Sequence, residues 1–500
     1  MTKFTLILVI AVVGSISMSD LLSQTVLPRE NINTFSQDPV KLKKLRDAVA
    51  ALQGRGFDNS TSWFTMAGIH DIFPNDPAMS RVPAPIQLLF HQCHKREELF
   101  FLWHRAYVRA MERLMQEAIQ DPDFRLPYWD WYADPSLPKP FRDEFLDPQR
   151  TEKNALFIKN RSDRFPNVNG GEPIWTDGVV TNYANNNFAE FQNQLSGSEH
   201  GDIHWLIGTG TNMGDTHFAA RDPIFWLHHA NIDRLLMVWL KRSPATHKVP
   251  ADFPAWIASQ YRFPVSPGTT GNATPPVNTP SVAEIALGSM EAMGYTYDNM
   301  DLPPVPAPKV PAAPQHLQVA AASPSGTAAA NIERFVTVKS AAQALEVAAG
   351  GTVDLAVRPN QRERIAALAE MSPSEKTAEK GLSIVFENVQ VKEVPEGLAS
   401  YRVFVNLPKE GAENAVFHDH FVGTLSLFQL KHAGEHGHST VRLPVSPATG
   451  ASALKKSLTG GGGGESKISI SLVPVLAPGA SAPKNPVLSI GEIRLEGARP

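Results

Sequence analysis

The stretch DPIFWLHHANIDR, residues 222–234, carries most of the information about how the first part of this chain folds. Asp222 can cap a helix whose first position is Pro223, because the aspartate accepts free N–H groups there and proline has none to satisfy. The apolar run that follows predicts a buried helix. His229 and Asp233 are four residues apart on it, so the carboxylate can accept the second ring N–H of His229 and orient a metal-binding imidazole.

The same stretch holds a second imidazole, His228, next to His229. Adjacent side chains of a helix point in different directions, so we expect one ring to bind a metal and the other to pack beside it. The alternative is a polar helix start in which a histidine stacks on Trp226. An unpaired histidine in a buried helix is costly, and this favours the metal.

A further pair of histidines, His200 and His204, lies in the sequence HGDIH. The four-residue spacing places both rings on one face of a helix, where they can bind one metal ion. Taken alone, the pair is weak evidence, because solvated or core histidines have the same spacing. The zinc-protease version of this motif needs a glutamate after the first histidine. Gly201 occupies that position, so the sequence excludes this hydrolytic mechanism.

Three more histidines precede these in the chain: His70, at the end of an apolar helical face, His94, and His104 in FFLWHRAY at residues 100–107. Each alone is more often an ordinary core or surface residue. Two groups of three histidines on helices predict a dinuclear site between the facing helices of a bundle. Nitrogen ligands suit copper or zinc, and copper has the higher intrinsic affinity.

Length and composition exclude several classes of protein. A chain of 500 residues exceeds one ordinary core, so two or more domains are expected. A net charge of −4 without a basic run argues against a nucleic-acid partner. A single cysteine rules out an intrachain disulfide framework and a CxxC zinc site.

The N-terminus resembles a secretory signal. Residues 1–19 combine an early lysine, a short apolar run and small residues before a cleavage point near Ser19. We therefore expect export to the periplasm or the exterior, and no stable membrane span, since about 20 apolar residues are needed for one. A buried N-terminal strand or a short anchor is the alternative.

The remaining boundaries follow from changes in residue pattern. Residues 20–300 predict a mainly α domain, a four-helix bundle with long loops. Residues 301–331 are rich in proline and alanine and predict an exposed, cleavable linker. Residues 332–500 predict an all-β sandwich. The segments that alternate with period two are 352–357, 383–386, 401–405 and 467–472.

Four stretches together resemble the tyrosinase, catechol oxidase and molluscan haemocyanin superfamily, whose members hold two copper ions. The stretches are FFLWHRAY (100–107), LPYWDW (126–131), HGDIH (200–204) and DPIFWLHHANIDR (222–234). The likeness covers roughly residues 20–297. Gly294–Tyr297 looks like the tyrosine motif that closes this domain in polyphenol oxidases, and Arg29 is its expected partner. YRVFVN at 401–406 is similar to the C-terminal domain of plant-type polyphenol oxidases.

The resemblance implies a set of ligands for the two copper ions. Copper A would take His70, His94 and His104, and copper B would take His200, His204 and His229, with His228 as a neighbour. His94 precedes His104 by ten residues where the family usually has nine, so His91 is the alternative ligand. Cys93 directly precedes His94, which differs from the family's thioether-forming cysteine and argues against that crosslink.

The resemblance also implies an activity, the oxidation of phenols and catechols to o-quinones with O2. Monophenol-active relatives often have an asparagine where this chain has Gly201, which helps a glutamate, here Glu190, to hold a water. Its absence favours diphenol oxidation. Thr216 lies at a position that gates the pocket in relatives, and it is small. Met213 or Trp205 could fill the entrance, and Phe225 belongs to the pocket wall.

The C-terminal domain is expected to cover the pocket, so that cutting the linker, with a protease as partner, releases activity. The alternative is a domain that only stabilises the chain. Histidines of this domain form a second group, for which surface loops or transient copper delivery are the two interpretations: His418, His420, His432, His436 and His438. Rival functions are an o-aminophenol oxidase, a haemocyanin-like oxygen carrier and a non-catalytic zinc-stabilised binding protein.

Overall fold

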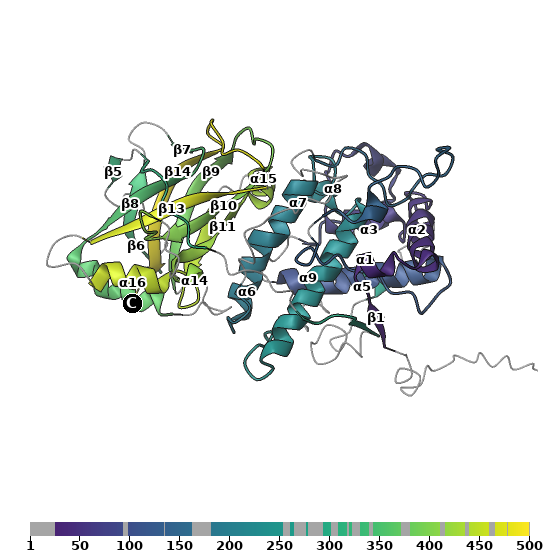
Figure 1. Ribbon diagram of the computed structural model, residues 1–500, viewed down its shortest axis with the longest axis horizontal. Helices are drawn as coiled ribbons and strands as arrows, with labels where there is room; N and C mark the ends of the chain where they lie inside the picture. Colours follow the sequence, from purple (N-terminus) through teal and green to yellow (C-terminus); the bar gives the residue numbers. More distant parts are fainter. Residues whose placement is uncertain are drawn as a thin grey trace, which may run out of the picture.

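The chain folds into a helical region followed by a β-rich region, each with its own buried core (Figure 1). This confirms the order predicted from the sequence. The computed structural model describes residues 26–93, 99–134, 136–162, 182–253, 261–264, 277–278, 294–301, 309–317, 320–322, 331–339, 344–371, 381–410, 416–435, 440–459, 466–477 and 479–499. The predicted signal segment, residues 1–19, lies outside the described residues.

The helical region is built around two long helices that pack against each other, α5 (Phe100–Ala118) and α9 (Pro223–Arg242). The side chain of Asp222 accepts a hydrogen bond from the Ile224 amide at 3.1 Å, so α9 begins where the sequence predicts. The other α-helices among the described residues of this region are α1 (Ile32–Phe35), α2 (Pro39–Gln53), α3 (Trp63–His70), α4 (Ala84–Gln87), α6 (Phe188–Leu195), α7 (Gly201–Ile207) and α8 (Thr216–Ala219). Between α6 and α7 lies a π-helical turn, η6 (Ser196–His200).

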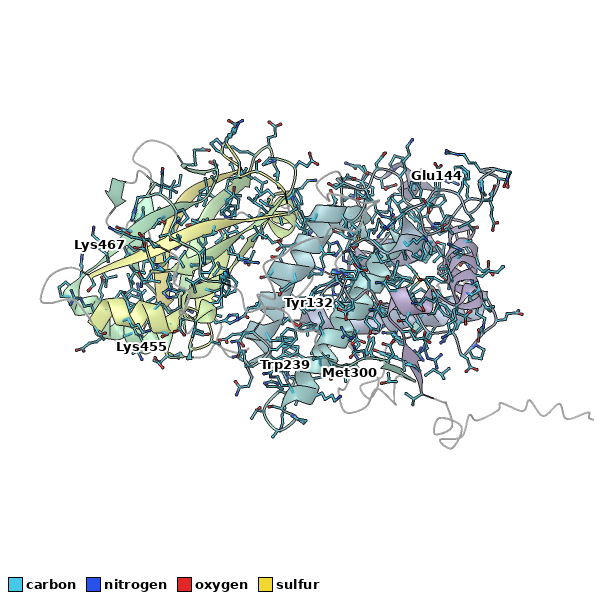
Figure 2. All side chains as sticks on the ribbon, viewed as in Figure 1. Tyr132, Glu144, Trp239, Met300, Lys455 and Lys467 are labelled. Carbon is cyan, nitrogen blue, oxygen red and sulfur yellow. The ribbon has the colours of Figure 1, made fainter. Side chains whose placement is uncertain are left out.

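Aromatic side chains fill the spaces between these helices. Trp239, which is labelled in Figure 2, is fully buried near the end of α9. Its ring stacks on that of Phe191 at 4.9 Å and on that of His247 at 4.5 Å. Such aromatic pairs add to the stabilisation that burial of their area gives. They fix α9 against α6, the helix that leads into HGDIH.

The two ends of the helical region meet at a buried polar cluster. Strand β1 (Leu27–Arg29) pairs in parallel with β4 (Tyr295–Tyr297). The guanidinium carbon of Arg29 lies 3.6 Å from the ring centre of Tyr295, and its Nη1 donates to the Tyr297 hydroxyl at 3.1 Å. Arg29 is therefore the partner of the tyrosine motif, as predicted. Both tyrosine hydroxyls donate to Oδ2 of Asp233 on α9, at 2.5 and 2.6 Å.

Glu112 on α5 balances the positive charge of this cluster. It accepts from Arg29 Nε at 2.8 Å and from Arg109 Nη1 at 2.6 Å, and its side chain is fully buried. Burial opposes its ionisation, but the two guanidinium groups outweigh burial and lower the pKa of Glu112 from 4.5 to about 2. The carboxylate is therefore ionised and pairs with two guanidinium groups, of which Arg29 is fully buried and Arg109 is 7% exposed.

We expect Glu112→Gln to lower the free energy of unfolding by about 3–5 kcal/mol, because it leaves a buried guanidinium uncompensated. Denaturant unfolding measures this. Glu117→Gln is the control on the same helix: its carboxylate lies 3.7 Å from Arg55 and is 37% exposed, so the loss should stay below about 1 kcal/mol. Equal losses in the two variants would contradict the role of Glu112.

The contribution of Glu112 also depends on pH. Its pKa is lower in the folded chain than in the unfolded one, so its stabilisation is complete above pH 4.5 and disappears as the pH falls towards about 2. The difference in unfolding free energy between wild type and Glu112→Gln should shrink over that interval. A difference that stays constant between pH 5 and pH 2 would argue against an ionised Glu112.

The β-rich region contains two antiparallel sheets that share one core. The four-stranded sheet has the order β11 (Phe421–Ser426), β10 (Leu398–Val405), β13 (Ser466–Leu476), β8 (Gly351–Val357). The larger sheet has the order β12 (Val441–Val445), β9 (Leu382–Val391), β14 (Leu488–Ala498), β6 (Ile332–Lys339), β5 (Ala320–Ala322), and β7 (Leu345–Val347) also pairs with β14. All four segments with period-two alternation lie in strands, as predicted.

The prediction of an all-β domain is wrong in one respect, because this region also contains helices. They are α13 (Arg362–Ala369), α14 (Phe417–His420), α15 (Leu427–Glu435) and α16 (Ala451–Thr459). In α16 the buried residues Ala451, Leu454 and Leu458 follow a helical spacing of three and four. This apolar face packs on the sheets. Residues 332–500 therefore bury side chains through helical spacing as well as through strand alternation.

The two regions touch along α7 and α15, which lie side by side in Figure 1. Trp205 of α7 is buried in the core of the β-rich region, and the hydroxyls of Ser198 and Thr424 are 2.9 Å apart. Most of the predicted linker, 301–331, lies outside the described residues. Two of its described parts belong to the β-rich region: 309–317 joins it through the bond from the Leu317 amide to the Thr352 carbonyl, 2.8 Å, and 320–322 forms β5 of the larger sheet. The prediction that the whole of 301–331 is an exposed linker is therefore wrong for these residues. Within the described ranges no helix is long and apolar enough to cross a membrane.

Candidate metal centre

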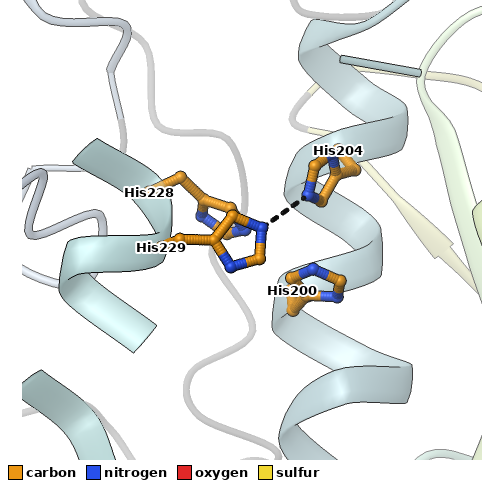
Figure 3. A group of neighbouring side chains, drawn as sticks. All are labelled: His200, His204, His228 and His229. Atoms are coloured by element: carbon orange, nitrogen blue, oxygen red, sulfur yellow. Dashed lines mark hydrogen bonds between the residues drawn. The ribbon is translucent and has the colours of Figure 1, made fainter. Parts of the chain in front are cut away.

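Four helices bring buried histidines together in the helical region. His70 is the last residue of α3, His104 lies in α5, His200 and His204 lie on η6 and α7, and His228 and His229 lie on α9. None of these six side chains belongs to a residue more than 6% exposed. Figure 3 shows His228 and His229 on one helix, facing His200 and His204 on the other.

The predicted third ligand of copper A, His94, lies outside the described residues. The alternative, His91, has its Nδ1 2.7 Å from Oδ1 of Asp71, and its side chain is 46% exposed. Beside His70 and His104 lies Cys93, whose Sγ is 3.5 Å from Nε2 of His104. Burial raises the pKa of the Cys93 thiol well above its ordinary value. The cysteine is therefore a neutral thiol near one ligand of this group.

Four of the six imidazoles are held in the same way. In each, Nδ1 is hydrogen-bonded to a backbone carbonyl, which can only accept, so Nδ1 carries the proton and Nε2 keeps its lone pair for a metal. The pairs are His70 with Thr216 at 3.1 Å, His104 with Phe100 at 2.8 Å, His200 with Ser196 at 3.1 Å and His204 with Met213 at 2.8 Å.

Burial keeps these imidazoles neutral. It lowers the pKa of His70 to about 4 and that of His200 to about 3. For His204, His228 and His229 the pKa is well below the ordinary value, again chiefly because of desolvation. A metal ligand must be unprotonated, so all five residues are in the form that a metal binds.

The ring nitrogens lie in two adjoining groups. In the first, one ligand atom each from His200, His204, His228 and His229 falls within 4.8 Å of the others. In the second, His70, Cys93 and His104 meet the same criterion. The ring of His104 stacks on that of His229 with centres 4.0 Å apart and an angle of 8°. The two groups therefore share a boundary, as a dinuclear site requires.

His228 and His229 differ in their partners. The Trp131 indole N–H donates to Nδ1 of His228 at 3.1 Å, which fixes that ring with its proton on Nε2. Nε2 of His229 lies 3.4 Å from Nε2 of His204, shown as the dashed line in Figure 3. Both rings face α7, so the expectation that His228 merely packs beside the site is too simple. The partners still favour His229 as the ligand.

The predicted hydrogen bond between His229 and Asp233 is wrong. Asp233 is engaged by Tyr295, Tyr297 and Arg29 on the opposite side, and His229 Nδ1 has no hydrogen-bond partner among the described residues. The four-residue spacing places His229 and Asp233 on one face of the helix, but the carboxylate of Asp233 accepts its hydrogen bonds from the tyrosine motif instead.

These observations fit a pair of metal ions. Since Nδ1 of His204 is bonded to the Met213 carbonyl, its Nε2 lone pair is left for Nε2 of His229 at 3.4 Å, where the hydrogen bond between the two rings can be replaced by a shared metal ion. The donor set consists of neutral imidazoles in two groups, with one thiol beside them. Nitrogen donors of this kind suit copper or zinc and not magnesium or calcium.

A cavity of about 390 Å³ opens over these histidines, between the helical and β-rich regions. From the β-rich region, Phe428 of α15 enters it. Its ring stacks on that of His204, with centres 4.5 Å apart and an angle of 12°. The sequence contained no signal for this residue, because α15 belongs to another domain and Phe428 resembles any core phenylalanine.

Some of the residues predicted to form the pocket line the cavity, and others lie elsewhere. Glu190 lines the cavity, accepts from Asn185 at 2.6 Å and has its pKa raised by burial. Thr216 also lines it. Phe225 packs against His229, with ring centres 4.2 Å apart. Trp205 does not fill the entrance, since it is buried in the core of the β-rich region.

Gly201 is placed where the two regions touch. A Cβ atom on Gly201 would lie 2.5 Å from Oγ and 3.4 Å from Cβ of Ser426 in β11. A side chain at this position would therefore press on the β-rich region. Met213 contributes its backbone carbonyl to His204 and is itself fully buried.

The C-terminal histidines do not form one cluster in the described residues. His418 and His420 lie in α14, and His436 and His438 lie outside the described residues. His432 of α15 instead contacts the helical region, with its Nδ1 2.6 Å from Oγ1 of Thr216. The interpretation as a surface loop is therefore wrong for His432.

Comparison with known families agrees with this arrangement. Residues 60–170 and 147–242 match the common central domain of tyrosinase. The chain is 28% identical over 312 residues to the tyrosinase HcTyr1 of Hahella sp. (strain CCB-MM4), covering 54% of this chain and 62% of that protein. It is 26% identical over 239 residues to the chloroplastic (+)-larreatricin hydroxylase of Larrea tridentata, covering 40% and 39%.

A third relative has an oxygen-carrier name: hemocyanin units G and H of Sepia officinalis, 28% identical over 229 residues, covering 43% of this chain and 37% of that protein. The chain thus spans less than two thirds of the length of these three relatives. Solved structures extend the likeness in fold. Latent aurone synthase, a polyphenol oxidase, has a TM-score of 0.56 at 18% identity, covering 96% of this chain and 90% of that chain.

Latent apple tyrosinase gives a TM-score of 0.52 at 18% identity, covering 95% of this chain and 97% of that chain. The β-rich region is therefore included in the shared fold. Two copper ions are the cofactor of the family, and the two histidine groups supply neutral nitrogen ligands for them. Residues 60–242 of the chain therefore carry the common central domain of tyrosinase, and both histidine groups lie within this stretch.

Proposed function

We propose that this chain is a polyphenol oxidase that uses O2 to oxidise catechols to o-quinones. The observation that carries the proposal is the convergence of buried, neutral imidazoles whose Nδ1 atoms are fixed by backbone carbonyls, beneath a cavity large enough for a phenol. We assign His70, His94 and His104 to copper A, and His200, His204 and His229 to copper B.

The residues of the chain bind the metals, orient the ligand rings and exclude water from the site. When bound, the copper pair supplies the redox chemistry, in which two catechols lose two electrons each and one O2 is reduced to two waters. The backbone carbonyls hold the ligand rings in one tautomer and orientation. Phe225 and Phe100 pack on the histidines, at 4.2 Å from His229 and 4.8 Å from His104, and keep the metal side of the cavity apolar.

We propose that diphenols are better substrates than monophenols. A monophenol must lose its hydroxyl proton before it is oxidised, which calls for a positioned base or water. Gly201 has no side chain to hold one. Glu190 faces the same cavity, but its Oε2 is engaged by Asn185 at 2.6 Å, and burial raises its pKa. The hydrogen bond from Asn185 makes this oxygen a weaker acceptor for the proton of a monophenol, whereas the raised pKa by itself would make the carboxylate a stronger base, so the preference rests on Gly201 and on this hydrogen bond.

We further propose that the chain is latent. Phe428 occupies the space over His204 in which a phenol ring would stack, and Ser426 and Thr424 of β11 line the same cavity. Substrate then reaches the metals after the β-rich region moves, or after a protease cuts the segment that joins the two regions. Export guided by residues 1–19 is part of this proposal.

The test uses the full-length chain loaded with copper, as wild type and as Phe428→Ala. Quinone formation from catechol, tyramine and o-aminophenol is followed by absorbance, together with copper content. We expect two copper ions per chain, as six nitrogen ligands for two metals imply, and faster turnover of catechol than of tyramine. Equal turnover of both would contradict the diphenol preference, and turnover of o-aminophenol alone would favour an o-aminophenol oxidase.

The hemocyanin relative makes an oxygen carrier the second candidate. A carrier would use the same histidines and would keep phenols away from the metals. Reversible O2 binding without quinone formation, in the wild type and in Phe428→Ala, would support an oxygen carrier. A chain that retains zinc and no copper would contradict both candidates.

A further inference from the structure

A second group of metal-ligating side chains lies at the junction of the two regions. Asp71 follows α3, His217 lies in α8 and His432 lies in α15, so the first two belong to the helical region and the third to the β-rich region. One ligand atom from each falls within 4.8 Å of the other two. The side chains are 8%, 3% and 15% exposed.

The two imidazoles present the same nitrogen to the same carboxylate. Nε2 of His217 lies 3.6 Å from Oδ2 of Asp71, and Nε2 of His432 lies 4.0 Å from that oxygen. Neither distance is short enough for a good hydrogen bond. Three donors that face one point at these separations leave space for a cation between them, because metal–ligand bonds to zinc are about 2.0–2.2 Å long.

Each ring is held by its other nitrogen. Nδ1 of His217 lies 3.0 Å from Oδ1 of Asp215, and its ring stacks on that of Phe73 at 3.7 Å and 11°. Nδ1 of His432 lies 2.6 Å from Oγ1 of Thr216. A carboxylate or hydroxyl behind a ligating histidine fixes the ring and makes Nε2 a better ligand, which is the arrangement of built metal sites.

The charges around the group favour a cation. Asp71 and Asp215 bring two carboxylates, and Lys431 places its Nζ 3.7 Å from Oδ2 of Asp215. His91 approaches the other oxygen of Asp71, with Nδ1 2.7 Å from Oδ1. A divalent cation would therefore meet a net negative environment with two nitrogen donors and one oxygen donor.

We propose that Asp71, His217 and His432 form a third metal site, which binds a zinc-like divalent cation and holds the β-rich region against the helical region. Two imidazoles and one carboxylate are a common zinc ligand set, with water as the fourth ligand. The site needs only the docked arrangement of the two regions and does not require copper at the dinuclear centre. Thr216 connects the two sites, because its carbonyl contacts His70 and its hydroxyl contacts His432.

The site would act as a latch because its ligands come together only in the docked chain. A ligand that binds one of two states shifts their ratio by a factor of about 1 + [L]/Kd, so free zinc at 100 times its Kd favours the docked form about 100-fold. The fraction of chains in which α15 is undocked would fall by the same factor.

The test measures zinc bound to the copper-loaded, full-length chain after gel filtration. We expect one zinc per chain in addition to copper, lost in His432→Gln and in His217→Gln and retained in His432→Glu, since a carboxylate can replace an imidazole as ligand. The control is His316→Gln, in the same region: its side chain is 60% exposed with Nε2 3.3 Å from Asp354, and it should bind zinc as wild type does.

Hydrogen exchange of α15 amides gives the second readout. Zinc should slow it about 100-fold at 100 times Kd in wild type and leave it unchanged in His432→Gln. Equal zinc binding by wild type and His432→Gln, or no zinc beyond the copper sites, would overturn the proposal. Copper content and catechol turnover of the same samples report separately on the proposed oxidase function, so the failure of one does not imply the failure of the other.

Discussion

His229→Asn is expected to remove copper B and to lower catechol oxidation by more than about 100-fold, the upper limit of what loss of a supporting residue behind a ligand usually costs. His229 is fully buried, its Nε2 lies 3.4 Å from that of His204, and its ring stacks on that of His104. It therefore belongs to the boundary between the two metal positions. Copper per chain and quinone formation measure the loss, both in the Phe428→Ala background so that the cavity is open.

His228→Asn is the matched control, because His228 is equally buried and directly adjacent. We expect it to keep two coppers. Its effect should be limited to the Trp131 indole N–H, which donates to Nδ1 of His228 at 3.1 Å, and the loss of such a buried hydrogen bond costs about 1–3 kcal/mol of stability. If His228→Asn loses copper and His229→Asn keeps it, the assignment of the ligand is reversed.

Phe428→Ala is expected to raise catechol turnover by the full-length chain at least about tenfold, since 1.4 kcal/mol of lost docking free energy already changes a ratio of states by ten. The ring of Phe428 stacks on that of His204 at 4.5 Å and fills the space above it. Truncation opens the cavity even when the β-rich region stays docked. Initial rates of quinone formation, with copper content held equal, measure the gain.

Phe421→Ala separates activation from general destabilisation. Phe421 lies in β11, seven residues earlier in the chain, and is fully buried in a small core with Phe404 and Phe417. Loss of a buried phenylalanine costs about 3–5 kcal/mol in either position. We expect Phe421→Ala to lower the stability of the β-rich region without opening the cavity. Activation of both variants to the same extent would show that Phe428 has no special place in latency.

Local sequence patterns determined much of the helical region. The cap at Asp222 and Pro223, the single helical face that carries His200 and His204, and the pairing of Arg29 with Tyr297 follow from spacing or from family motifs. Such patterns are reliable because helix geometry repeats every 3.6 residues and fixes which side chains share a face. The same regularity gave a wrong prediction at Asp233. Its carboxylate shares a helix face with His229 but is hydrogen-bonded to Tyr295 and Tyr297.

What the tertiary structure alone decided are the contacts between segments that are distant in the chain. Phe428 over His204, Ser426 against Gly201, and His432 beside His217 and Asp71 all depend on how the β-rich region docks on α7 and α8. No periodicity encodes that docking, because it depends on the complementary shape of two finished surfaces. The sequence predicts the helices and the histidines that they carry, whereas the packing of the two regions against each other sets which residues lie over those histidines.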